Sequence, residues 1–218
     1  MISKRIKEIA KYTKDSYKII DVGCDHGYLI IEALTNYNVK YALAVDNKSK
    51  PLDFAVNNII KEGLIDRVKF YLSNGLDKLD DECDAIVISG LGGVLISNII
   101  NDNIRKINKQ RLILQANRNN YELRKYLAEN NFVFIDEEII YEDFYYQIIV
   151  AKKNIEKIVL TESQLHYGPI NIIKRSKLFL NMLKKEEEIL NKIPDSNTSK
   201  KEKKEIIRSI LNESKRCN

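Results

Sequence analysis

The feature that most constrains the fold of this chain is a short strand-like run that leads straight into a glycine-bearing turn. The run spans Lys18 to Val22, and the turn holds Gly23 and Gly27 before the apolar segment that starts at Tyr28. A β-branched, apolar-leaning run of this length predicts a buried strand. Glycines give the backbone freedom and let a ligand come close. In open α/β sheets, ligands bind in the crevice at the carboxyl ends of the strands.

The residues of this turn indicate which class of ligand the crevice accepts. A dinucleotide fingerprint has the pattern G-x-G-x-x-G, and its pyrophosphate rests on the helix N-terminus. This chain has Asp25 at the central position, between Gly23 and Gly27. A carboxylate there repels pyrophosphate and attracts a cation. The pattern therefore disfavours nicotinamide and flavin dinucleotides and favours S-adenosylmethionine (SAM), which carries a sulfonium and an amino group. The alternative is an ordinary strand-to-helix turn with two glycines.

Strand-like and helix-like segments alternate along most of the chain. We predict strands at 18–22, 39–45, 68–72, 85–88, 111–114, 132–141 and 144–152. We predict helices at 2–13, 28–35, 49–62, 94–100 and 120–129. This alternation implies right-handed βαβ units and a parallel sheet, and the last two strands form an antiparallel hairpin. The predicted fold class is α/β, with the Rossmann-like seven-stranded sheet of SAM-dependent methyltransferases.

The chain changes character after residue 154. We predict a connection at 160–168, a helix that continues to Ile193, a loop at 194–198 and a second helix at 200–214. Two amphipathic helices joined by a short loop predict a coiled-coil-like helical hairpin. We therefore divide the chain into a SAM-binding domain, 1–154, and a helical domain, 155–218. From Lys152 onward, 16 Lys and Arg face 9 Asp and Glu, an excess of seven positive charges. This asymmetry indicates a polyanionic partner, and a solvated lysine-rich helix face is the alternative.

Composition excludes several other classes of protein. The three cysteines, Cys24, Cys83 and Cys217, lie far apart without C-x-x-C spacing, and the chain has only two histidines. We expect neither a disulfide framework nor a metal site, and this cysteine usage suits a reducing cytoplasm. No apolar run reaches the roughly 18 residues of a membrane span, and no signal peptide is apparent.

Polar groups at successive strand ends converge on the same crevice. Asp46 ends the second predicted strand, where an acidic residue accepts hydrogen bonds from ribose hydroxyls or caps the following helix. Asn74 and Gly75 end the third strand and either read an adenine edge or form a plain Asn-Gly turn. The three glycines of Ser89–Gly93 indicate a close backbone approach or a flexible turn. Asn117 either caps a helix or faces the crevice.

Two side chains of the first turn have open roles. His26 is either a general base or a turn-stabilising group, and the structural role is favoured. Tyr28 either stacks on a base or packs against the fold, and packing is favoured.

Three motifs together resemble one family. They are D-V-G-C-D-H-G-Y-L at Asp21–Leu29, S-G-L-G-G at Ser89–Gly93 and Q-A-N at Gln115–Asn117. In combination they resemble the TrmK family of bacterial SAM-dependent methyltransferases, which modify N1 of adenine at tRNA position 22. The resemblance extends over nearly the whole chain. The family usually has methionine at Leu91, a change that conserves volume. It usually has proline at Ala116, so the loop that carries Asn117 is expected to be less rigid.

The resemblance implies SAM as the cofactor, tRNA as the partner and a cytoplasmic, monomeric enzyme. Adenine N1 has an in-plane lone pair that can attack a methyl group without prior loss of a proton, and the methylated base is cationic. Asp25 either stabilises the charge that develops on the ring or holds the amino group of SAM. The alternatives are a methyltransferase of small molecules or proteins, and a tRNA-binding protein without activity. Our catalytic candidates are Asp25, His26, Tyr28 and Asn117. Our cofactor-binding candidates are Asp21, Gly23, Cys24, Asp25, Gly27, Asp46, Asn47, Asn74, Gly75, Gly90, Leu91 and Gly92.

Overall fold

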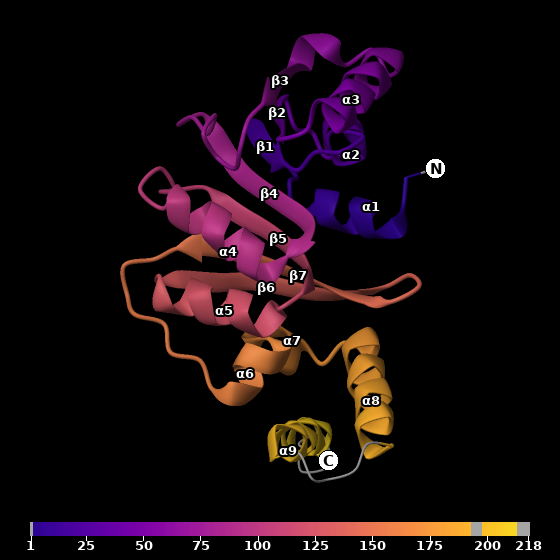
Figure 1. The fold of residues 1–218 in the computed structure, drawn as a ribbon, viewed down its shortest axis with the longest axis vertical. Helices are drawn as coiled ribbons and strands as arrows, with labels where there is room; N and C mark the ends of the chain where they lie inside the picture. Colours follow the sequence, from indigo (N-terminus) through magenta and orange to yellow (C-terminus); the bar gives the residue numbers. More distant parts are fainter. Residues whose placement is uncertain (1, 193–197, 213–218) are drawn as a thin grey trace.

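The fold is built on one seven-stranded sheet with the strand order β3-β2-β1-β4-β5-β7-β6 (Figure 1). The computed structural model describes residues 2–192 and 198–212. Strands β1 to β5 run parallel, and β7 is antiparallel to both of its neighbours. The strands are β1 (Lys18–Val22), β2 (Tyr41–Asp46), β3 (Val68–Leu72), β4 (Cys83–Gly92), β5 (Arg111–Arg118), β6 (Phe132–Tyr141) and β7 (Tyr145–Lys153). The predicted α/β fold class is confirmed.

Helices cover both faces of this sheet because successive strand residues point to opposite sides. In β1, Ile19 joins the apolar cluster under the first three helices, whereas Ile20 joins the cluster under the next two. The first layer contains α1 (Lys4–Lys11), α2 (Tyr28–Asn36) and α3 (Ser49–Lys61), and the second contains α4 (Gly93–Asp102) and α5 (Asn120–Glu129). A 3₁₀ turn, η1 (Ile65–Arg67), precedes β3. Helix α3 begins at Ser49, as predicted, and Lys48 holds the N-cap position.

Strands β4 and β5 are longer than predicted and contain two motifs that we expected to be loops. The two strands pair with each other beyond their predicted ends, from Ser89 opposite Gln115 to Gly92 opposite Arg118. The register shifts on both sides of Leu91, and Gly90 has a φ of 78°. The glycines therefore accommodate bulges in a strand. Ala116 is buried within β5, so Asn117 lies on a strand rather than on a loop, and the expected lower rigidity of this segment stays a prediction.

The described residues of the C-terminal part form helices that lie below the sheet in Figure 1. They are α6 (Glu162–Tyr167), α7 (Pro169–Lys174), α8 (Lys177–Asn191) and α9 (Thr198–Asn212). The predicted connection at 160–168 is wrong because Thr161 and Gln164 form a capping box that starts α6. The predicted single helix to Ile193 is interrupted at Arg175, which has a φ of 49°. Most of the predicted loop at 194–198 and the predicted end at Ser214 fall outside the described residues.

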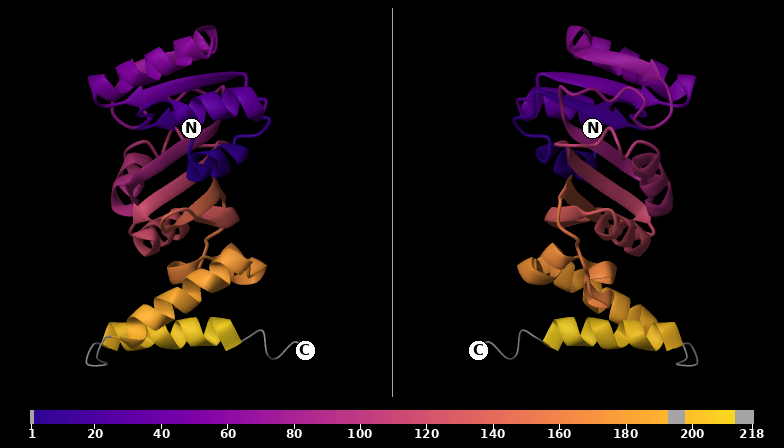
Figure 2. Two further views of the ribbon diagram at one scale, coloured as in Figure 1. Left: turned by 90° about the vertical axis from the view of Figure 1, so that its right-hand side faces the viewer. Right: turned by 90° about the vertical axis from the view of Figure 1, so that its left-hand side faces the viewer.

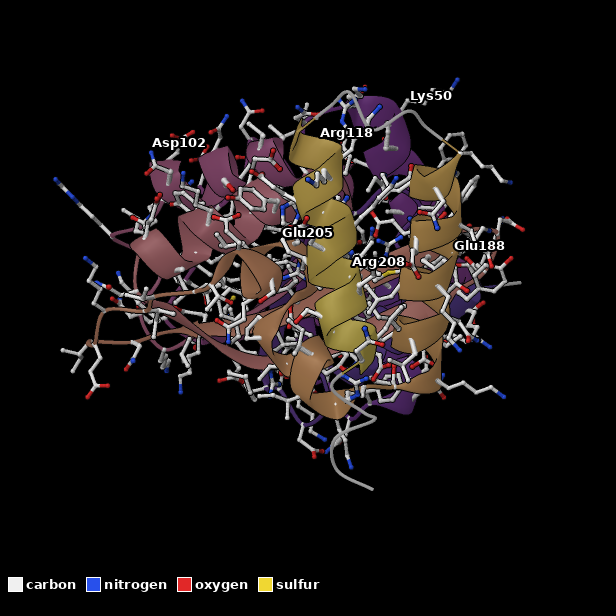
Figure 3. The ribbon with its side chains drawn as sticks, turned by 90° about the horizontal axis from the view of Figure 1, so that it is seen from below. Lys50, Asp102, Arg118, Glu188, Glu205 and Arg208 are labelled. Carbon is white, nitrogen blue, oxygen red and sulfur yellow. The ribbon has the colours of Figure 1, made fainter. Side chains whose placement is uncertain are left out.

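Helices α8 and α9 pack on each other, and α8 slopes across α9 (Figure 2). Phe179 and Leu183 of α8 share a buried cluster with Ile207 and Ile210 of α9. Arg208 lies between the two helices in Figure 3 and binds Glu187, with 2.8 Å between Nε and Oε1. The predicted pair of amphipathic helices is present, and its coiled-coil-like character stays a prediction.

A buried ion pair joins the helical part to the sheet. Arg124 of α5 and Glu137 of β6 are 2.8 Å apart between Nε and Oε1, and both side chains are fully buried. Their other hydrogen bonds reach from these elements to the side chain of Gln147, the carbonyls of Leu165 and His166, and the amides of Ile170 and Asn171. A buried ion pair is tolerated only when its remaining donors and acceptors are satisfied in this way.

Candidate active site

The turn after β1 is held by backbone hydrogen bonds and by residues with positive φ. The amides of Gly23 and Cys24 both donate to the carbonyl of Val45 at the end of β2. Gly23 has a φ of 76°, and a Cβ there would stand in open space. Gly27 differs, because a Cβ would lie 3.1 Å from Cβ of Ala55 in α3. Glycine at 27 therefore permits helix packing, whereas glycine at 23 leaves the approach to the backbone open.

A cavity of about 400 Å³ lies above this turn and brings most of the predicted site residues together. The predicted residues that line it are Asp21, Gly23, Cys24, Asp25, His26, Tyr28, Asp46, Asn47, Gly90, Leu91 and Asn117. An adjoining cavity of about 460 Å³ shares Gly23, Asp46 and Asn47 with it and adds Asn74 and Gly75. The two cavities form one elongated cleft across the carboxyl ends of β1 to β4. Gly27 and Gly92 line neither cavity, and their predicted cofactor contacts stay predictions.

Three carboxylates surround the turn. Asp21 is buried at the end of β1, and this burial, together with the nearby charges of Asp46 and Asp25, raises its pKa to about 7. Asp46 accepts hydrogen bonds from the backbone amides of Asp25, at 3.2 Å, and Lys48, at 3.0 Å. The side chain of Asp25 is 69% exposed, so its carboxylate faces the mouth of the cavity. Such a cluster favours a cationic ligand, whose charge offsets the repulsion among the carboxylates.

Cys24 does not have the properties of a reactive thiol. It is buried, and this burial together with the neighbouring carboxylates of Asp21, Asp46 and Asp25 raises the pKa of its thiol well above the ordinary value. A nucleophilic cysteine needs a lowered pKa, so Cys24 contributes a neutral wall to the cavity.

An aromatic stack lies at the mouth of the cavity. The His26 ring lies between Phe54 and Tyr28, with ring centroids 5.0 Å and 5.7 Å away. Its Nε2 is 3.8 Å from Oδ1 of Asp25, and its backbone carbonyl accepts a hydrogen bond from Asn58. Tyr28 is 40% exposed, so its ring presents a face to solvent. Both roles considered for His26 and for Tyr28 stay open, and Phe54 is an addition that the sequence did not indicate.

A closed ring of hydrogen bonds fixes the Gly90 backbone at the other side of the cavity. The Gly90 amide donates to Oε1 of Gln115, Nε2 of Gln115 donates to Oδ1 of Asn117, and Nδ2 of Asn117 donates to the Gly90 carbonyl. Arg5 of α1 donates to both Oε1 of Gln115, at 3.3 Å, and Oδ1 of Asn117, at 3.4 Å. The Q-A-N motif therefore holds the glycine-rich motif in place. Arg5 was missed by sequence reasoning, since it belongs to no motif.

Comparison with known proteins identifies the family. The sequence model of TrmK, described as tRNA (adenine(22)-N(1))-methyltransferase, matches residues 19–215. This chain belongs to the TrmK family. The tRNA (adenine(22)-N(1))-methyltransferase of Bacillus subtilis, a TrmK relative, is 34% identical over 154 residues, which are 69% of this chain and 65% of that protein. The chain thus aligns with slightly less than two thirds of that enzyme's length.

Two solved structures are similar over nearly their whole length. A Streptococcus pneumoniae protein in complex with S-adenosyl-L-methionine is 31% identical, with a TM-score of 0.90 over 97% of this chain and all of that one. The TrmK of M. capricolum in complex with S-adenosyl-homocysteine is 32% identical, with a TM-score of 0.80 over 98% of this chain and 97% of that one. The sequence-based assignment to the TrmK family is confirmed.

Two features are absent from the part of the chain that the structure describes. No helix within residues 2–192 and 198–212 is both long and apolar enough to span a bilayer. Among the same residues, His, Cys, Asp and Glu side chains form no group of three or more with metal-binding geometry.

Proposed function

We propose that this chain transfers a methyl group from SAM to N1 of adenine 22 in tRNA, acting as a monomer in the cytoplasm. The observation that carries the proposal is the cluster of Asp21, Asp25 and Asp46 around the open side of Gly23. These carboxylates suit a cofactor with positive charges and disfavour one with phosphates. Family membership supports the choice of methyl donor and of tRNA as the substrate.

The residues of the cleft fit this cofactor along its length. Each carboxylate oxygen of Asp46 accepts one backbone hydrogen bond, which leaves further lone pairs for ribose hydroxyls. Asn74 and Gly75 line the adjoining cavity, where an amide side chain and exposed backbone meet an adenine edge. Gly23 leaves room for the amino-acid portion to approach the backbone. We assign the cationic groups of the cofactor to the neighbourhood of Asp21 and Asp25.

The mechanism depends on alignment and charge. When bound, the cofactor would supply an electrophilic methyl group on a sulfonium, and in-line attack on the methyl carbon would break its bond to sulfur and release a neutral thioether. Adenine N1 needs no general base, because its lone pair is available at neutral pH. The chain holds the Gly90 backbone rigid through Gln115 and Asn117, and such alignment lowers the barrier by several kcal/mol. Asp25 either stabilises the positive charge that develops on the purine ring or holds the amino group of the cofactor.

The helical part, 155–218, is our candidate for holding the tRNA. N1 lies on the Watson–Crick edge, so the target base must be unpaired and turned out of its stack. The solvent-exposed Lys184, Lys192 and Lys201 lie on the helical part, where they are available to bind phosphates. The contact reads the shape of the folded RNA more than its sequence.

The decisive experiment is incubation of the protein with labelled SAM and unmodified tRNA, followed by nucleoside mass analysis. We expect 1-methyladenosine at position 22 and tRNA binding that weakens steeply with salt. SAM binding without methyl transfer to tRNA favours a small-molecule or protein substrate. tRNA binding without SAM binding in calorimetry favours a protein that kept the fold and lost activity. Either result contradicts the proposed function.

Deleting the helical part is a poor test of its role. A chain that ends before Thr161 loses the carbonyls and amides that complete the Arg124–Glu137 pair. The two charges would then lie against the sheet without these partners, which destabilises the fold. Substitution of the exposed lysines, for example Lys184→Glu with Lys201→Glu, removes phosphate contacts and leaves that pair intact. We expect weaker tRNA binding and unchanged SAM binding.

A further inference from the structure

A second groove adjoins the cofactor cavity. Its volume is about 610 Å³, and it lies between α1, the turn that joins β6 to β7, and α8. Its lining residues are Arg5, Asn117, Phe144, Tyr145, Tyr146, Met182, Lys185, Glu186 and Ile189. Arg5 and Asn117 line both this groove and the cofactor cavity, so the two spaces adjoin at these residues. A strand of substrate that reaches the cofactor has this groove beside it.

The groove offers an unpaired aromatic face. Phe144, in the β6–β7 turn, is 69% exposed, although a residue of this size ordinarily avoids water and turns favour polar residues. Its neighbour Tyr145 is instead tilted against Tyr141, with centroids 4.8 Å apart. An exposed ring at the rim of a groove is a stacking platform for a nucleic-acid base.

The charges of the groove favour an anion. Nζ of Lys185 lies 5.8 Å from the centroid of the Tyr145 ring, and the guanidinium of Arg5 lies 4.9 Å from the centroid of Tyr146. Glu186, the carboxylate in the lining, is neutralised by Lys203 at 2.5 Å. The two cations suit a phosphate, because the carboxylate of the groove is paired with Lys203, and the aromatic rings beside the cations suit a base. The groove therefore matches the two parts of one nucleotide.

We propose that this groove binds the unpaired nucleotide next to the target adenine, with its base stacked on Phe144 and its phosphate beside Lys185. The proposal rests on the proposed function, because it requires a target base above the cofactor cavity. A neighbouring nucleotide is the group of the same strand that reaches the groove when the target base enters past Arg5 and Asn117. Binding there holds the strand in the turned-out geometry that N1 needs.

The test is a cycle that combines protein and RNA changes. Single-turnover methylation is measured for the wild type, Phe144→Ala and Phe144→Tyr, each with intact tRNA and with tRNA abasic on either side of adenine 22. We expect Phe144→Ala to lower the single-turnover rate of methylation of intact tRNA by on the order of 10- to 100-fold. Phe144→Tyr keeps the ring and should retain the rate. With the wild type, an abasic nucleotide on one side of adenine 22 should slow methylation as much as Phe144→Ala does. With Phe144→Ala, the same abasic nucleotide should cause no further loss of rate.

A second pair of variants separates the phosphate contact from general charge. Lys185→Ala should weaken tRNA binding more than Lys177→Ala, which removes the same charge from an exposed position of α8 outside the groove. SAM affinity in calorimetry and the melting temperature should be unchanged in both. If the effect of Phe144→Ala adds to that of the abasic nucleotide at each of the two positions, the proposed subsite is wrong, while the proposed function still holds. A wild-type chain that leaves adenine 22 unmethylated overturns the proposed function and the subsite with it.

Discussion

Arg124 and Glu137 lie 2.8 Å apart between Nε and Oε1 with no exposed side-chain surface, at the junction between the sheet and the C-terminal helices. The other oxygen of Glu137 accepts hydrogen bonds from Ile170 and Asn171, at the start of α7. The position of the helices relative to the active site is therefore set by charged groups that water does not reach.

Glu137→Gln should be strongly destabilising because it leaves the guanidinium of Arg124 buried without a counter-charge. We expect a loss of about 3–5 kcal/mol in the free energy of unfolding. Glu138→Gln is the matched control, since the Glu138 side chain is 34% exposed beside Lys174 and its loss costs about 1 kcal/mol or less. Urea denaturation measures both values. Equal effects would contradict the importance of the buried pair.

Gly168→Ala tests the same junction through sterics. Gly168 has a φ of 90°, and a Cβ there would lie 2.2 Å from Oε2 of Glu137. Gly63 also has a positive φ, of 69°, and has open space around a Cβ. Gly63→Ala therefore reports backbone strain alone, on the order of 1 kcal/mol. We expect the melting temperature to fall clearly further for Gly168→Ala, and a similar fall in both would contradict the clash.

The protonation of Asp21 should make the stability of the ligand-free protein depend on pH. Its pKa rises from 3.8 to about 7 on folding, chiefly through burial and then through Asp46 and Asp25. Between these values the folded state holds a proton that the unfolded state has lost, so the free energy of unfolding should fall as pH rises from about 4 to about 7. Asp21→Asn should flatten this dependence. Denaturation across this range measures it, and parallel curves for both proteins would contradict the raised pKa.

A bound cation should reverse part of this effect. The positive charges of SAM favour the ionised form of Asp21, so SAM affinity should increase as pH rises toward and through 7. Calorimetric titration of the wild type with SAM between pH 6 and 8 tests this, because the range brackets the Asp21 pKa of about 7. Asp21→Asn, which lacks the titrating group, is the reference. The wild type and this variant should differ in slope.

Gln115→Ala should reduce methyl transfer without removing the cofactor site. Gln115 accepts the Gly90 amide and binds Asn117, while it does not line either cavity of the cleft. We expect kcat to fall by on the order of tenfold or more as the Gly90 backbone loosens. Asn130→Ala, at the end of α5, serves as the control, because among the residues that the structure describes the Asn130 side chain hydrogen-bonds to the nearby carbonyl of Tyr126 and does not reach the site. A kcat unchanged relative to this control would contradict the positioning role.

Asp25→Asn is a sharper test of the carboxylate than replacement by alanine. Asp25 has a φ of 47°, a conformation that asparagine tolerates better than alanine does. The variant therefore removes the charge with little backbone strain. We expect tRNA methylation to fall severely, and SAM affinity from calorimetry tells whether the charge serves binding or the chemical step. A rate near that of the wild type would show that the proposed role of Asp25 is wrong.

Local sequence signals predicted most of the sheet and its helices. The range Asn120–Glu129 matches α5, because a periodic apolar pattern and flanking polar residues define it. The ends of β4 and β5 were missed because pairing between strands, rather than propensity, extends them through glycines. Helix α6 was overlooked although Thr161 and Gln164 carry a capping-box pattern. The helix break at Arg175 was not predicted because no glycine or proline lies beside it in the sequence.

The site was predictable where one motif supplies its residues and not where distant segments meet. The Asp21–Tyr28 turn and Asp46 follow strand ends, and the sheet brings them together. Arg5 comes from an amphipathic helix whose polar face resembles any solvated face, so only its approach to Gln115 reveals it. Arg124 and Glu137 were missed for the same reason, since a charged residue in a surface helix or an edge strand ordinarily faces water.

The open space beside Gly90 has an evolutionary consequence. Gly90 lines the cofactor cavity, and nothing lies within 4 Å of the place where its Cβ would stand, so a side chain at this position has room in the cleft. A substitution there would occupy space in the cleft at the cost of a side chain at positive φ, and it would leave the packed core unchanged. Under the proposed function, a single substitution at this glycine would therefore be enough to give a folded but inactive relative.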